Sequence, residues 1–166
     1  ETVMPRHAFF CFHRERDRWR ADQVRKSWIE RDTSESGFPE PADWNAILDG
    51  GDEALEAWID QQLEGTTVTV VLVGAETAEQ DHVLTEIEKS YGRGNGLVVI
   101  FINGMLDQGG ARDKKGANPL ADFQVDHDRV KVPLSKLYPA YDWVTDMGRM
   151  NLNAWIEDAA RRAGKA

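Results

Sequence analysis

The chain has 166 residues, of which 41% are hydrophobic, and this is enough to bury one core, so we expect a single domain over residues 1–166. The net charge of −9 disfavours nucleic acid as a partner, because nucleic-acid-binding domains normally need a clustered basic surface. Cys11 is the only cysteine, which excludes an internal disulfide, and no apolar run is long enough to cross a membrane. We therefore expect a cytoplasmic protein without a membrane partner.

The first apolar segment, Ala8 to Phe12, reads AFFCF and predicts a buried strand. A helix should follow, capped by Asp17 and placing Trp19 and Trp28 in the core. This order of a buried strand and an amphipathic helix is typical of the first unit of an α/β sheet.

Basic residues cluster after this strand, against the acidic balance of the whole chain. The arginines are Arg14, Arg16, Arg18, Arg20 and Arg25. A small molecule that bears phosphate needs only one or two such residues, whereas duplex binding needs a wider surface. His13 and Arg14 directly follow the first strand, where doubly wound sheets present ligand-binding groups. A solvated loop is the plainer interpretation of this pair.

A long polar connection runs from Asp32 to Gly51 and contains two prolines and a Gly-Gly pair. Loops of this length in a compact domain are usually functional or mobile, and we expect the second strand to be short, irregular or absent. Phe38 and Trp44 either anchor this loop on the domain or offer aromatic faces to a base or to another protomer.

A helix capped by Asp52 and ended by Gly65 should come next. The residues at its helical spacing are Leu55, Trp58, Ile59 and Leu63. They should pack on the sheet, whose central strand is predicted at Thr67 to Val73, a nearly continuous apolar run rich in β-branched residues.

The helix after the central strand carries the main catalytic candidate. Thr77 and Gln80 have the spacing of a capping box, and an apolar stripe is predicted at Val83, Leu84, Ile87 and Tyr91. This stripe places Glu86 and His82 on one flank of the helix, with Glu86 beside the sheet rather than under it. Glu86 would then border the ligand crevice of an open α/β sheet, although a solvated helix carboxylate is the plainer alternative.

The rest of the chain completes the sheet. Leu97 to Ile102 predicts a third buried strand, and Val130 to Leu134 a final strand at an edge, since Pro133 cannot donate a ladder hydrogen bond. The long polar loop Asn103 to Asp128 has no EF-hand spacing, so we predict no metal site there, despite a group of possible ligands: Asp122, Asp126, His127 and Asp128. A last helix carries Leu152, Trp155, Ile156 and Ala159 at core spacing.

Together these elements predict an α/β fold with a central parallel sheet of four or five strands and helices on both faces. A P-loop, a receiver-type acidic cluster and a Ser nucleophile elbow do not occur in the sequence. A carboxylate with nearby cationic and aromatic groups remains, and this set suits cleavage of an N-glycosidic bond through an oxocarbenium-like transition state. In that chemistry Arg14 or a neighbour would hold a pyrophosphate, and Trp44 or Phe38 could cover a ring.

Several segments resemble one known family. GDEALEAWIDQQLEGTTVTVVLVGAETAEQDHVLTEIEKS, together with AFFCFHRERD, GRGNGLVVIFI and GANPL, is similar to the TIR-like domains of the bacterial Thoeris antiphage system. The resemblance implies a flavodoxin-like TIR fold. It also implies an enzyme that takes NAD as a substrate rather than a cofactor, releases nicotinamide, and makes a cyclic ADP-ribose isomer or related signal that activates a partner effector.

The resemblance also implies roles for particular residues. TIR enzymes carry a catalytic glutamate in a W-x-x-x-E pattern, and HVLTE places Glu86 on that glutamate, with His82 in the usual Trp position. Phe12, His13 and Arg14 match the end of the first strand, where TIR enzymes contact the nucleotide. Asp32 to Trp44 corresponds to the BB loop, through which we expect self-association.

Two other functions stay open at this point. A noncatalytic TIR module that works by self-assembly would leave Glu86 as a surface residue, and would not turn over NAD. An enzyme similar to nucleoside deoxyribosyltransferases shares the architecture and a catalytic glutamate, and would exchange free bases on deoxynucleosides without consuming NAD.

Overall fold

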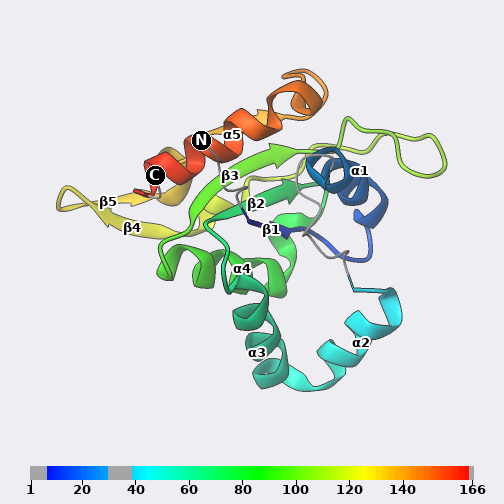
Figure 1. The fold of residues 1–166 in the computed structure, drawn as a ribbon, viewed down its shortest axis with the longest axis horizontal. Coiled ribbons are helices and arrows are strands. Elements are labelled where there is room, and N and C mark those ends of the chain that lie inside the picture. Colours follow the sequence, from blue (N-terminus) through cyan, green and yellow to red (C-terminus); the bar gives the residue numbers. More distant parts are fainter. Residues whose placement is uncertain (1–6, 30–38, 165–166) are drawn as a thin grey trace, which may run out of the picture.

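A computed structural model describes residues 7–29 and 39–164 of the chain. Its centre is a parallel sheet of four strands in the order β1-β2-β3-β6 (Figure 1). The strands are β1 (Ala8–Cys11), β2 (Val68–Val73), β3 (Gly96–Phe101) and β6 (Ala140–Asp142). The first three are buried along their whole length, as their continuous apolar runs predict.

Helices cover both faces of this sheet (Figure 1). On one face, α1 (Arg18–Ile29) and α5 (Gly148–Arg162) pack Trp28 and Trp155 against Phe10 and Val70 of the strands. On the other face lie α3 (Gly51–Leu63) and α4 (Asp81–Gly92). The α/β fold with a parallel sheet, consistent with a flavodoxin-like TIR fold, is thus confirmed.

The predicted final strand is wrong in its placement. β5 (Val130–Pro133) pairs antiparallel with β4 (Gln124–His127), and the two form a separate hairpin that projects from the domain (Figure 1). Short 3-10 helices flank it, η2 (Pro119–Asp122) and η3 (Leu134–Lys136). The outer strand of the main sheet is instead β6, which pairs with β3. Because β6 has only three residues and lies in an aromatic segment, its sequence is hard to distinguish from a loop.

The predicted loop from Asp32 to Gly51 contains a helix, α2 (Pro41–Asp49), which packs against α3. Pro41 lies at the start of this helix, where its missing amide proton costs nothing. No strand lies between α1 and β2 in the described residues, and Asp32 to Phe38 fall outside them.

Two predicted caps and one core position are also wrong. Gly50, not Asp52, occupies the N-cap of α3. Thr77 begins a separate 3-10 helix, η1 (Thr77–Glu79), and accepts a hydrogen bond from the Gly74 amide, so no capping box forms. Trp19 is 44% exposed rather than in the core. Asp17 does lie directly before α1, where its carbonyl accepts a hydrogen bond from the Ala21 amide and its carboxylate pairs with Arg20.

Among the described residues, none of the helices combines the length and apolar character that a bilayer crossing needs.

Candidate functional site

The buried face of α4 differs from the predicted stripe. It consists of Val83, Glu86, Ile87 and Ser90, while Tyr91 is 36% exposed. The Thr69 hydroxyl on β2 donates to the Ser90 hydroxyl at 2.7 Å, so a polar pair takes a place expected to be apolar. The buried face of α4 is therefore rotated relative to the predicted stripe, and Glu86 points inward. The prediction of a carboxylate on the flank beside the sheet is wrong.

The Glu86 carboxylate is sealed inside the protein. Its exposed fraction is 0%, and neither of its oxygens has a hydrogen-bond partner in the part of the chain that the structure describes. Arg14 Nη2 lies 3.7 Å from Glu86 Oε2, and looser polar contacts with Arg14 and the Cys11 thiol lower the carboxyl pKa. Burial outweighs both and raises the pKa of Glu86 to about 7.

Arg14 lies in a cage of four aromatic rings. The guanidinium carbon is 4.3 Å from the centroid of Phe12, 5.3 Å from Trp44, 5.4 Å from Trp58 and 5.9 Å from Phe9. Arg14 Nη2 also donates to the Phe10 carbonyl at 3.2 Å. Burial lowers the pKa of Arg14, but a guanidinium stays charged in proteins, and the electron-rich ring faces favour that charge.

Trp44 and His82 close this cage from outside. The Trp44 ring, carried by α2, meets the His82 ring edge-on at 5.1 Å and the Trp58 ring at 5.4 Å, and Trp44 is only 3% exposed. His82 Nε2 lies 3.2 Å from the Phe12 carbonyl, and burial lowers the pKa of His82 to about 4, so its ring is neutral at physiological pH. Of the two alternatives for Trp44, the structure shows the anchor.

The cavity at this place is small. Its volume is about 70 Å³, and His13, Arg14, Trp44 and His82 are among its lining residues, whereas Glu86 is not. Ligand pockets for molecules of drug size measure roughly 300–1,000 Å³. A dinucleotide therefore does not reach Glu86 in this arrangement.

The part of the chain that holds this site matches a known family. The family model of the Thoeris protein ThsB, TIR-like domain, covers residues 9–107. The chain belongs to this family. A ThsB-family relative from Bacillus cereus (strain MSX-D12), named "Putative cyclic ADP-D-ribose synthase ThsB1", is 28% identical over 191 aligned positions, which cover 92% of this chain and all of that protein.

The ThsB-family chain brings most of the predicted site residues together. Glu86, Phe12, Arg14, Trp44 and His82 form one continuous group of contacts. His13 lies beside them, 9% exposed, and its Nδ1 accepts a hydrogen bond from the Arg16 amide. Phe38 lies outside the described residues.

Sequence reasoning did not assign Phe9, Cys11 and Trp58 to this site. Phe9 and Cys11 alternate along β1 and face α3 and α4, whereas Phe10 faces the opposite side. The period of two in AFFCF was the signal that could have found them. Trp58 was predicted to be core and contacts the cage from there.

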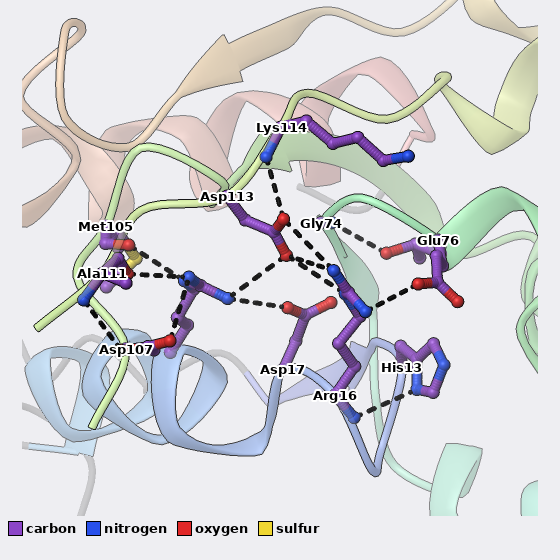
Figure 2. A network of polar contacts seen from close by, with 12 residues as sticks. His13, Arg16, Asp17, Gly74, Glu76, Met105, Asp107, Ala111, Asp113 and Lys114 are labelled. Carbon is purple, nitrogen blue, oxygen red and sulfur yellow. Dashed lines mark hydrogen bonds and ion pairs between the residues drawn. The ribbon is translucent and has the colours of Figure 1, made fainter. Parts of the chain in front are cut away.

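Two further arginines of the cluster, Arg16 and Arg20, hold a loop in the ThsB-family chain, and Figure 2 shows the contacts of Arg16. Arg16 forms two hydrogen bonds with the Asp113 carboxylate and an ion pair of 2.6 Å with Glu76. Arg20 is 3% exposed and donates to the carbonyls of Met105 and Ala111. These bonds hold residues 103–118 over the carboxyl edge of the sheet, so Arg16 and Arg20 already have carboxylate and carbonyl partners.

The four possible metal ligands predicted between 122 and 128 stay apart from the site. Asp122 ends η2, and the others lie on the exposed hairpin. The described residues include no group of three or more His, Cys, Asp or Glu side chains that could hold a metal ion.

Proposed function

We propose that this ThsB-family chain is an enzyme of antiphage defence that consumes NAD, releases nicotinamide and makes a cyclic ADP-ribose isomer or a related signalling nucleotide, which activates an effector. The observation that carries this proposal is the Glu86 carboxylate, which is buried next to a caged guanidinium and has no hydrogen-bond partner among the described residues. An unsatisfied buried carboxylate is costly, and such sites are concentrated where chemistry needs them. The printed name of the Bacillus cereus relative agrees with this activity.

The proposed reaction breaks the bond between the nicotinamide nitrogen and C1′ of its ribose. Nicotinamide leaves as a neutral molecule with the bonding electrons, so no general acid is required. Ionised Glu86 stabilises the positive charge that develops at C1′. A hydroxyl of the same nucleotide then attacks C1′ and passes its proton to the Glu86 carboxylate, which closes a ring, whereas attack by water with the same proton transfer would give linear ADP-ribose.

This function requires the site to open. Trp44 covers Arg14 and His82, and the cavity of about 70 Å³ beside them does not admit a dinucleotide. Displacement of α2, which carries Trp44, would uncover the end of β1 and the flank of α4. After closure around the substrate, the same aromatic side chains would exclude water, which favours cyclisation over hydrolysis.

NAD turnover by concentrated protein tests the proposal, with nicotinamide, ADP-ribose and cyclic products separated by mass-resolved chromatography. Glu86→Gln keeps the shape of the side chain and removes its charge. Glu88→Gln is the matched control, because Glu88 is exposed on the same helix. We expect nicotinamide release from wild type and E88Q, and at least 100-fold less from E86Q, as for loss of one electrostatic stabiliser. Equal activity of E86Q and wild type would exclude Glu86.

Activity that exchanges bases on deoxynucleosides without NAD loss would instead identify the deoxyribosyltransferase-like alternative. Silence of all three proteins, also when they are concentrated by a crowding agent or assembled on a scaffold, would favour the noncatalytic module.

A further inference from the structure

We propose that Arg14 is a positioning residue, which keeps Glu86 ionised and oriented by a caged ion pair, and that Arg14 does not bind substrate phosphate. This inference deepens the proposed function and rests on it for its activity measurement. Its second measurement, made on protein stability, does not need any activity.

The position of Arg14 argues against a phosphate ligand. Arg14 is 7% exposed, and rings from β1, the turn after it, α2 and α3 surround its guanidinium. A phosphate-binding arginine offers the fork of its guanidinium to the ligand. In Arg14 the Nη2 atom instead bridges the Phe10 carbonyl at 3.2 Å and Glu86 Oε2 at 3.7 Å.

The same position explains how a carboxylate can remain charged in this interior. A fully buried carboxyl group is driven towards its neutral form, because desolvation penalises the charge. Neutral Glu86 could not stabilise positive charge at C1′. An opposite charge within about 4–6 Å favours the ionised form by roughly 1–3 pKa units, and Arg14 is the cation at this distance.

Other charged or titratable groups lie near the Arg14–Glu86 pair, and each has a defined charge state or partner. The Cys11 thiol from β1 contacts Glu86, and burial and the Glu86 charge raise the pKa of Cys11, so it is neutral. His82 on α4 is neutral because of its lowered pKa. Arg18 on α1 acts on Arg14 only at a distance and is itself paired with Glu40. Arg14 is therefore the group whose removal should change the ionisation of Glu86.

Three substitutions separate the roles. Arg14→Met removes the charge and keeps an apolar side chain among the rings. Arg14→Lys keeps a positive charge on a shorter side chain. Arg18→Met is the matched control, because Arg18 is a neighbouring arginine that does not contact Glu86. For each protein, kcat/KM for NAD is measured from pH 5 to pH 9, since its acid limb reports the essential base of the free enzyme.

We expect R14M to move the acid limb upwards by about 1–3 pH units, to recover activity at high pH, and to change KM little. R14K should return the limb towards the wild-type position, and R18M should leave it unchanged. A uniform loss of activity without movement of the limb would overturn the proposal. A large increase in KM with an unmoved limb would assign Arg14 to substrate phosphate instead.

The stability measurement compares each protein with its E86Q counterpart by urea unfolding over the same pH range. The difference in unfolding free energy between wild type and E86Q changes with pH between the pKa of Glu86 in the unfolded chain and its pKa in the folded state, so the upper end of this change marks the folded-state pKa. In the R14M background this upper end should lie at higher pH by the same 1–3 units. If the change stays at the wild-type pH, the proposal fails even in the absence of measurable turnover.

R14M leaves Glu86 without its cation and should be least stable at high pH. The double variant R14M/E86Q removes both charges and should recover stability there. If R14M does not fold while R14M/E86Q does, the ion pair is established by that contrast. If R14M/E86Q recovers no stability over R14M at high pH, or if neither folds, Arg14 acts through its shape alone and the proposal is wrong.

Discussion

At the scale of single residues, two buried titratable groups lie close together and respond to pH in opposite directions. Burial raises the pKa of Glu86 to about 7 and lowers the pKa of His82 to about 4. As pH falls from about 7 to 4.5, protonation of Glu86 stabilises the folded state. As pH falls from 6.5 to about 4, the unfolded state binds a proton on His82 that the folded state does not, which destabilises the fold. The two effects oppose each other over most of this pH range.

The first prediction concerns His82. Its pKa should be near 4 in the folded protein, because the ring is buried against Trp44 and the Phe12 carbonyl. An NMR titration of the His82 ring signals measures this value directly. A His82 pKa near 6.5 would contradict the closed packing around Trp44.

The second prediction concerns Gly74, at the end of β2. A Cβ atom placed there would lie 2.2 Å from Asp17 Oδ2, and Asp17 is buried. Gly74→Ala should therefore lower the unfolding free energy by about 1–3 kcal/mol, as other overpacking substitutions do. Gly109→Ala is the control, since the nearest atom there is 3.4 Å away in an exposed loop, and it should change stability by less than about 0.5 kcal/mol. Equal effects in urea unfolding would contradict this packing.

At the scale of elements, α2 is the helix that must move for the proposed function. Trp44 is its only residue classed as buried, whereas α3 buries Ile59 and Leu63 completely. A helix with so little apolar burial opens at low free-energy cost. The closure of the site thus depends mainly on one side chain.

The third prediction follows from this difference between the two helices. In hydrogen–deuterium exchange, amides of α2 should exchange faster than those of α3 by at least tenfold, because α2 can open without unfolding the sheet. Trp44→Ala should increase the exchange of α2 further and leave β2 unchanged. Equal protection of α2 and α3 would show that the site opens only by global unfolding.

The fourth prediction concerns the loop 103–118, which Arg16 and Arg20 hold over the sheet. Arg16→Met removes the paired contact with Asp113 and should speed amide exchange and proteolysis within this loop. Because Arg16 is partly exposed, its loss should change the global stability little. Lys26→Met is the matched control, since the partner of Lys26 among the described residues is Asp22 on the same helix. Unchanged proteolysis of the loop in R16M would contradict the assigned role.

At the scale of the whole molecule, the β4–β5 hairpin lies outside the main sheet and beyond the residues that match the family. Its four-residue strands are mostly exposed. The fifth prediction is that Gly-Gly in place of residues 126–131 leaves the fold intact, with Tm lowered by no more than about 4 °C. Deletion of residues 106–111, which removes the Ala111 carbonyl that Arg20 binds, should lower Tm more. A larger loss from the hairpin change would show that the hairpin supports the domain.

Most of the sheet could be predicted from the sequence, because three of its strands are continuous apolar runs between polar turns. β6 could not, since three half-exposed residues leave no hydrophobic pattern. The rotation of α4 was missed because Ser90 and Glu86 look solvent-facing by residue type, and only the Thr69 hydroxyl and the Arg14 cage make an inward orientation favourable. Residues that depend on a partner far along the chain, such as Asp113 with Arg16, carry no local signal.

The ring that seals the site is also a chromophore. Trp44 and Trp58 contact each other edge-on, and they are two of the six tryptophans in the chain. Movement of α2 would transfer the Trp44 indole from an apolar interior to water, which shifts indole emission to longer wavelength. Opening and closing can thus be followed by intrinsic fluorescence in real time, without a substrate or a label.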